Sequence, residues 1–100
     1  MLTKQDIFQT IIDNKEAIKN FGVTEIGLFG SYVRDEQTDE SDIDLLIHYN
    51  IKEINYKKYF LFCEYMDNLF SSKKVEIVSK NGLSQYIGPH ILKSVKYVEI

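Results

Sequence analysis

Residues 30–47 read G-S-Y-V-R-D-E-Q-T-D-E-S-D-I-D-L-L-I and join a glycine–serine pair to two acids in an apolar segment. The segment over 23–29, V-T-E-I-G-L-F, is typical of a strand and precedes the pair, so Gly30 and Ser31 predict a tight turn between a strand and a helix. Such a turn offers backbone N–H groups, a small hydroxyl and the positive end of a helix dipole, which together suit an anionic phosphate. The turn is therefore a candidate phosphate site.

Two aspartates begin the apolar half of this stretch. Asp42 and Asp44 are two residues apart, so in a strand both side chains leave the same face. The intervening and following apolar residues, Ile43, Leu45 and Ile47, then point to the other face. Two carboxylates on one face can share Mg²⁺, which prefers carboxylate oxygens, water and substrate phosphates. The segment thus predicts a metal site beside a phosphate site, as nucleotidyl transfer requires.

The composition bounds what the chain can be. Its 100 residues, 44% of them apolar, suffice for one hydrophobic core, so we expect a single domain over 1–100. A formal net charge of -3 lacks the basic surplus of proteins that hold nucleic acid alone, so direct nucleic-acid binding is not expected. The single cysteine, Cys63, excludes an internal disulfide, and two histidines leave no usual zinc spacing. Oxygen atoms remain the metal ligands to consider.

Targeting signals are not evident. No apolar run is long enough to span a bilayer, and the first residues carry an early Asp6 in place of the apolar core of a secretory signal. We therefore expect no membrane association and a cytoplasmic location.

Turn signals and apolar spacing predict alternating helices and strands. Thr3, with Asp6 three residues later, predicts the cap of a helix that runs to about Asn20, and Asn55 predicts the cap of a second long helix. This order predicts an α/β (α+β) fold, a small mixed β-sheet packed against helices. The other expected elements are a strand over 23–29, a short helix from about residue 31, a loop over 35–41, a strand over 42–48, a helix over 56–70, a strand over 75–78, a turn at 81–82, a short helix from about residue 89 and an edge strand over 96–100.

The helix expected over 56–70 is apolar around more of its circumference than one buried face requires. Such a helix either lies between two layers or presents apolar surface to another protein. For one small domain the second alternative is favoured.

A third acid is expected to complete the metal site. Glu76 is the best candidate, because it lies between Val75 and Ile77 in an expected strand, and these neighbours face the core if Glu76 faces the cleft. Structural alternatives stay open, since Glu76 can be a solvent-facing acid of an edge strand and aspartates two apart also occur by chance.

The spacing G-S-x10-D-x-D, followed by apolar residues, resembles the signature of the polymerase-β-type nucleotidyltransferase superfamily. The short length, the start G-S-Y-x-R and the segment over 83–92, L-S-Q-Y-I-G-P-H-I-L, look most like its minimal (MNT-domain) members. The likeness covers nearly the whole chain and implies the minimal polymerase-β-like fold. Proteins of this group are often the antitoxin of a two-gene toxin–antitoxin pair.

The resemblance implies a metal-dependent catalytic site. Asp42, Asp44 and Glu76 would be the catalytic residues and the Mg²⁺ ligands, for one ion or, as we expect, two. Glu76 would also take the proton from the attacking hydroxyl. The resembled proteins more often have aspartate at this position, and glutamate is longer by one methylene.

The resemblance also implies a nucleotide-binding turn. Gly30 and Ser31 would hold the β- and γ-phosphates of ATP, and Arg34 would reach a phosphate as a planar donor. Arg34 can equally be a surface residue of the expected helix. Asp35 stands where the resembled proteins commonly have glycine, which places a negative charge near the triphosphate.

The chain leaves no room for a second domain that would bind an acceptor, so we expect a half-open cleft whose other wall comes from a partner. By resemblance, that partner is a HEPN-type ribonuclease toxin, and the chain is the antitoxin of a type VII-like system that moves AMP from ATP to a toxin tyrosine. AMP adds bulk and negative charge, which would repel the RNA phosphates that the toxin must hold.

Two other functions are compatible with the sequence. A non-catalytic antitoxin would neutralise the toxin by covering its site. A nucleotidyltransferase acting on a small hydroxylated molecule such as an antibiotic ranks last, because such enzymes usually bring an additional acceptor-binding domain.

Overall fold

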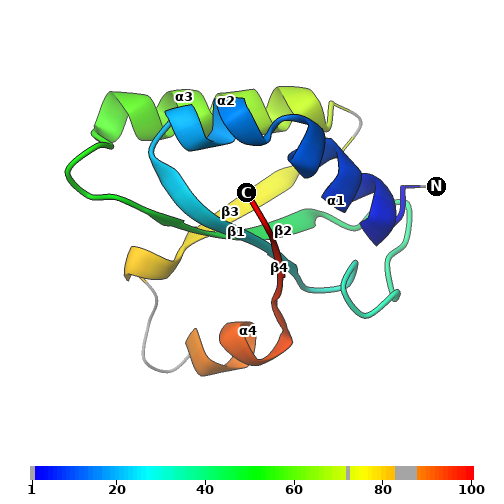
Figure 1. Cartoon of the computed structure of the whole chain (residues 1–100). Helices are drawn as coiled ribbons and strands as arrows, with labels where there is room; N and C mark the ends of the chain where they lie inside the picture. The colour runs from blue at the N-terminus through cyan, green and yellow to red at the C-terminus, as the bar shows by residue number, and fades with distance from the viewer. Residues whose placement is uncertain (1, 72, 83–87) are drawn as a thin grey trace.

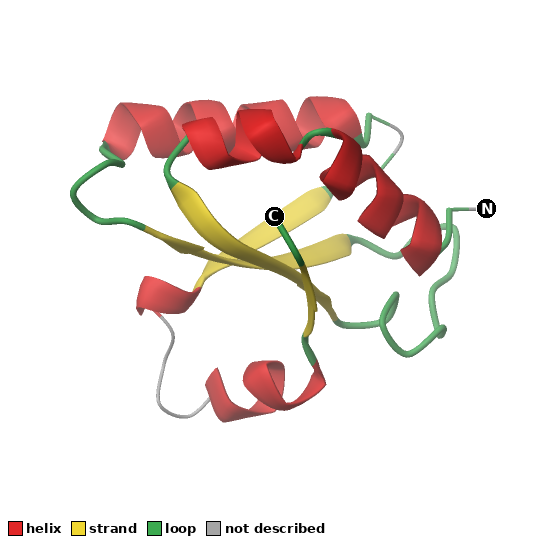
Figure 2. Cartoon of the chain, in the orientation of Figure 1, coloured by secondary structure: helices red, strands yellow, loops and turns green. Residues whose placement is uncertain are grey.

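A four-stranded sheet between two layers of helices forms the fold (Figure 1). The computed structural model describes residues 2–71, 73–82 and 88–100. The part of the C-terminal motif at 83–87 therefore lies outside the described residues. Figure 2 shows helices on both sides of the sheet, which confirms the predicted α+β class.

The sheet has the strand order β3-β2-β1-β4. β1 pairs antiparallel with both β2 and β4, whereas β2 pairs parallel with β3, so the sheet is mixed as predicted. The two inner strands, β1 and β2, carry the most buried side chains. The strands are β1 (Val23–Phe29), β2 (Ile43–Tyr49), β3 (Val75–Ser79) and β4 (Lys96–Val98).

Helices of unequal size cover the two faces. The first three lie together over one face, and the last lies on the opposite face (Figure 1). In the described residues no helix combines the length and the apolar character needed to cross a membrane. The helices are α1 (Lys4–Asp13), α2 (Lys15–Asn20), α3 (Tyr56–Leu69) and α4 (Gly88–Ser94), and a short 3-10 turn, η1 (Lys80–Gly82), follows β3.

The core lies between β1, β2 and the first three helices. Ile43, Leu45 and Ile47 are fully buried in it, which confirms that the apolar residues of β2 share one face. Ile26 and Leu28 add the matching residues of β1. Each such side chain contributes about 2 kcal/mol of transfer free energy when it is fully buried.

The predicted N-terminal helix is interrupted. Its cap is confirmed, because the Thr3 hydroxyl accepts from the Asp6 N–H and the Asp6 carboxylate accepts from the Thr3 N–H. The expectation of one helix to Asn20 is wrong, because Asn14 separates α1 from α2. The Asn14 amide donates to the Thr10 carbonyl and its oxygen accepts from the Tyr65 hydroxyl at 2.9 Å, so the side chain serves a tertiary contact at the break.

The long helix α3 has one buried and one exposed face. The Asn55 side chain accepts from the Lys58 N–H at 2.8 Å, which confirms the predicted cap. Phe62 and Met66 are fully buried, and the Phe21 ring meets Phe62 edge-on with 5.6 Å between centroids. The opposite face keeps large apolar side chains exposed.

Candidate active site

Three strands meet at one end of the sheet and bring the predicted site residues together. Phe29, at the end of β1, is the register partner of Asp44 in β2, and Asp44 is the register partner of Glu76 in β3. Gly30 follows Phe29 directly. The turn, the aspartate and the glutamate therefore form one row across three neighbouring strands.

The two acids of this row share a face of the sheet. Asp44 lies between Ile43 and Leu45, which enter the core, so its side chain leaves the opposite face, away from α1, α2 and α3. Glu76 is its direct parallel partner and leaves the same face. Its neighbours in β3 pack against the core, as predicted from the sequence, while the Glu76 side chain is 50% exposed.

Asp42 immediately precedes β2 and is half-buried. Its charge acts on Asp44 and helps to raise the pKa of that carboxyl. The structure thus places all three predicted acids at the same end of the sheet.

The electrostatics of the row centre on Asp44. Burial, followed by the charge and a hydrogen bond of Glu76 and by the charge of Asp42, raises the pKa of Asp44 to about 6, against the opposing effect of Arg34. Carboxylates in such proximity repel one another when ionised. A divalent cation between them would remove that repulsion, which is the physical requirement of a Mg²⁺ site.

Carboxylate oxygens are the donor set that Mg²⁺ prefers, so the residues fit this ion in kind. Within the described ranges, however, no three acidic, histidine or cysteine side chains converge closely enough to form a ready-made metal site. Lys74 lies on the Glu76 side of the row, with 3.6 Å between Nζ and Oε1. Sequence patterns assign no role to Lys74, because an exposed lysine beside a strand is usually only solvated.

Gly30 permits a close approach between the turn and Asp44. Its φ is +81°, and a Cβ at this position would lie 2.2 Å from Asp44 Oδ2. Any larger residue would push the Asp44 carboxylate out of its position and would also be strained. The glycine is therefore required both by the conformation of the turn and by the acid beside it.

The short helix predicted from residue 31 is wrong, because the chain closes only a single turn. The Glu36 N–H donates to the Ser31 carbonyl at 2.9 Å and the Asp35 N–H donates to the Tyr32 carbonyl at 3.3 Å. This pair of bonds is the usual ending of a helix, and here it forms within the first turn. The helix dipole expected behind the phosphate site is consequently missing.

The turn still presents backbone donors. In the part of the chain that the structure describes, the N–H groups of Ser31, Tyr32 and Val33 donate to no backbone or side-chain acceptor. The Tyr32 ring is fully buried in the core and holds the turn against it. Three consecutive N–H groups on a fixed turn can bind an anionic oxygen.

Asp35 ends the turn in a left-handed conformation, with φ of +57°. Glycine adopts this conformation without strain, which explains in physical terms why glycine is common here in the proteins that the sequence resembles. The Asp35 carboxylate pairs with Lys4 of α1 at 3.1 Å between Oδ2 and Nζ. Its negative charge is thus partly balanced within the chain.

Arg34 is exposed and pairs with Glu36, with 3.1 Å between Nε and Oε2. It lies near enough to Asp44 to oppose the upward shift of that pKa. The side chain is therefore at the correct end of the sheet for a phosphate contact, although in this structure Glu36 engages its Nε donor.

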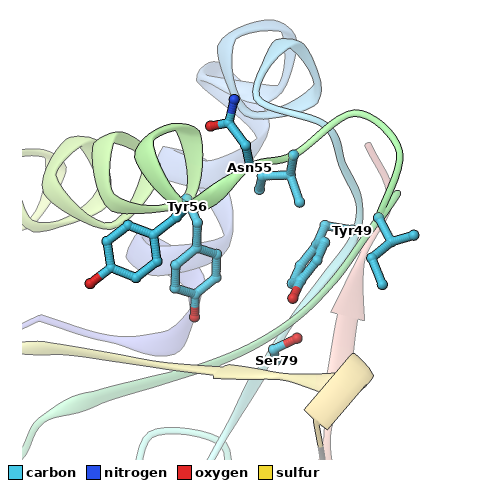
Figure 3. Close-up of a pocket in the computed structure, with 7 residues that line it drawn as sticks. Tyr49, Asn55, Tyr56 and Ser79 are labelled. Atoms are coloured by element: carbon cyan, nitrogen blue, oxygen red, sulfur yellow. The ribbon is translucent and has the colours of Figure 1, made fainter.

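A separate hollow of about 390 Å³ lies away from this row. Tyr49 at the end of β2, Ser79 at the end of β3, and Asn55 and Tyr56 at the start of α3 contribute to its lining (Figure 3). The row of Gly30, Asp44 and Glu76 occupies the opposite ends of β2 and β3. The size of the hollow therefore does not bear on the chemistry of the acids.

Comparisons with known proteins identify the family of the chain. The family described as nucleotidyltransferase domain matches residues 13–98. Protein adenylyltransferase MntA of Thermococcus cleftensis is 37% identical over 100 residues, which cover 98% of this chain and 98% of that protein.

Solved structures share the fold. One chain from a toxin–antitoxin structure with AMP-PNP superposes with a TM-score of 0.65 at 20% identity, over 96% of this chain and 72% of that one. Another comes from a tri-AMPylated Shewanella oneidensis HEPN toxin in complex with MNT antitoxin, with a TM-score of 0.57 at 16% identity, over 88% of this chain and 70% of that one.

Proposed function

This chain belongs to the nucleotidyltransferase domain family, and on that premise we propose that it is a Mg²⁺-dependent protein adenylyltransferase that serves as an antitoxin. The observation that carries the proposal is the row of Gly30, Asp44 and Glu76 across three strands. The similarity to an adenylyltransferase over nearly the whole chain supports the same chemistry.

Asp42, Asp44 and Glu76 would hold Mg²⁺ at the end of the sheet. When bound, Mg²⁺ neutralises charge on the phosphoryl oxygens of ATP and on the departing pyrophosphate. The pKa of Asp44 is raised by burial first and then by the charges of Glu76 and Asp42, and this second part supports the assignment, because crowded carboxylates favour a cation as well as a proton.

The turn would hold the triphosphate. The free N–H groups that begin at Ser31 would donate to the β- and γ-phosphates, and Gly30 would keep the turn close to Asp44. Arg34 would exchange its contact with Glu36 for a phosphate oxygen, which offers a planar donor the same kind of partner.

Glu76 would accept the proton of the acceptor hydroxyl. The acceptor oxygen attacks the α-phosphorus, a new O–P bond forms, and the bond from the α-phosphorus to the bridging oxygen of pyrophosphate breaks. An exposed carboxylate beside the metal-binding pair can meet a hydroxyl that arrives from outside the chain.

We place the acceptor hydroxyl on a tyrosine of a HEPN-type toxin. One structure with this fold is described as a complex of an MNT antitoxin with a tri-AMPylated HEPN toxin. Half of the Glu76 side chain faces solvent, so a second protein can complete the cleft.

The direct test is AMP transfer. The protein, ATP, Mg²⁺ and the product of the neighbouring gene are incubated together, and the mass of the partner is then measured by intact-mass spectrometry. We expect AMP adducts with the native chain and none with Asp42→Asn/Asp44→Asn, whereas Glu40→Gln, in the exposed loop before the acids, should retain transfer. A folded complex of the native chain that gives no adduct would refute the proposal.

A non-catalytic antitoxin is the second candidate. It is favoured by one observation, that the described acids do not converge into a ready-made metal site. If Asp42→Asn/Asp44→Asn still protects cells from the toxin at ordinary expression, binding alone suffices. If protection is lost while the complex still forms, transfer is required.

A further inference from the structure

The outer face of α3 is an apolar stripe between opposite charges. Phe60 and Leu61, at its middle, are 58% and 44% exposed. Lys57 lies one turn before them and Glu64 one turn after them, both exposed, so the four side chains follow one face of the helix. We call these four residues the α3 stripe. In Figure 1, α3 runs along the outer edge of the molecule, with the sheet on its other side.

The charges of α3 oppose its own dipole. Lys57 and Lys58 stand in the first turn, where the positive end of the dipole disfavours cations, and no acid stands there. Asp67 stands in the last turn, which has no basic residue. This placement destabilises an isolated helix. A neighbouring helix that runs antiparallel would offset this destabilisation, because it brings negative charge to the start of α3 and positive charge to its end.

From this pattern we infer that a second copy of the chain docks on the α3 stripe, with the two α3 helices antiparallel about a two-fold axis. The axis passes between Phe60 and Leu61, which then pack against the same residues of the other copy. Lys57 and Glu64 lie equally far from that axis along the helix. Each Lys57 therefore faces the partner's Glu64, and the contact contains this charge pair twice.

The contact is small. A standard interface buries roughly 800 Å² on each partner, or about one eighth of the 6245 Å² surface of this chain. One α3 stripe supplies less than that, so we expect a dissociation constant of about 10–100 μM. This inference goes beyond the proposed adenylyl transfer and does not depend on it, since none of the four residues belongs to the row of acids.

The test is sedimentation velocity of the isolated protein over a concentration range of about 1–300 μM. Lys57→Glu alone and Glu64→Lys alone should each weaken the dimer about tenfold, because each places like charges opposite one another twice. An equimolar mixture of the two variants should form a heterodimer of native strength, and Lys57→Glu/Glu64→Lys should restore the homodimer. Lys96→Glu and Glu99→Lys, exposed positions in and after β4, are the matched controls and should leave the dimer unchanged.

The apolar centre is tested separately. Phe60→Ala should weaken the dimer about tenfold, whereas Leu92→Ala, which removes a similarly exposed side chain from α4, should not. A native chain that stays monomeric up to about 300 μM would overturn the inference. So would a dimer that tolerates the single charge reversals, or loss of toxin binding by Lys57→Glu without any effect on self-association. AMP transfer assayed on the same variants reports on the proposed function independently.

Discussion

Asp44 and Glu76 are direct register partners in the parallel pair of β2 and β3, and both side chains leave the sheet face opposite the main core. Because neighbouring strands hold the two carboxylates side by side, their spacing is set by backbone hydrogen bonds and does not depend on a loop. The repulsion between them is therefore built into the folded state.

Burial of Asp44, together with this repulsion, gives the stability of the metal-free protein a definite pH dependence. The folded pKa of Asp44, about 6, lies above its ordinary value of 3.8, so the folded chain binds this proton more tightly than the unfolded chain. The stabilisation of the folded chain by protonated Asp44 is fully present below about pH 4 and is lost as the pH rises through 6. Asp44→Asn should remove this part of the pH dependence of the unfolding free energy. The variant should therefore be more stable than the native chain at pH 7.5. Urea unfolding of both proteins in EDTA across this range is the measurement, with Glu16→Gln as an exposed control. Equal slopes for Asp44→Asn and the native chain would contradict the assignment.

Mg²⁺ should stabilise the native chain above pH 6. An ion present at ten times its dissociation constant adds about 1.4 kcal/mol to the unfolding free energy. Asp42→Asn/Asp44→Asn should show no such increase. Thermal unfolding with and without Mg²⁺ at matched ionic strength gives the answer, and equal stabilisation of both proteins would place the binding elsewhere.

Gly30→Ala should lose both stability and AMP transfer. The added Cβ would meet Asp44 Oδ2 at 2.2 Å and also force alanine to a φ of +81°, at a cost of about 2–4 kcal/mol. Gly22→Ala is the matched control, because Gly22 has a φ of +97° but its nearest contact, Glu53 Cβ, is 3.4 Å away. It should lose about 1 kcal/mol and keep transfer. A similar loss of transfer in both variants would show that the effect is global.

Substitutions at Asp35 should follow the needs of a left-handed residue. Asp35→Ala should destabilise by about 1 kcal/mol relative to Asp35→Gly, because only glycine adopts this φ without strain. Asp35→Asn tolerates the conformation but loses the ion pair with Lys4, and should stay within about 0.5 kcal/mol of the native chain. Chemical denaturation gives the order, and alanine as stable as glycine would contradict the turn geometry.

The interruption between α1 and α2 should depend on the contact of Asn14 with Tyr65. Tyr65→Phe and Asn14→Ala should each cost about 1 kcal/mol, and the double variant should cost less than their sum. Tyr56→Phe, in which the altered side chain is 89% exposed, should have no effect. Additive losses would mean that the hydrogen bond does not couple the two helices.

Local patterns predicted much of the fold because their causes are local. The caps at Thr3 and Asn55 depend on hydrogen bonds three residues along, and alternation alone placed Ile43 in the core and Asp44 outside it. The position of Glu76 followed from the same alternation. Its catalytic role, like the roles of the other five predicted site residues, remains a prediction.

What local patterns missed depends on long-range contacts or on unusual conformations. The break at Asn14 coincides with a hydrogen bond from Tyr65, fifty-one positions away, which no helical period reveals. The single turn after Ser31 ends at Asp35 in a conformation that glycine usually signals, and the only sign of it in the sequence was that the resembled proteins commonly have glycine at this position. The collision that excludes a side chain at Gly30 likewise comes from a neighbouring strand.

The position of β2 inside the sheet also affects which parts of the molecule open first. β2 is paired on both sides, and its amides from Ile43 to Ile47 should be among the slowest to exchange with deuterium. β4 spans three residues at the edge and should exchange early. Mild warming would thus release the C-terminal edge while the strand that carries Asp44 is still closed, so Asp44 belongs to the most persistent part of the fold.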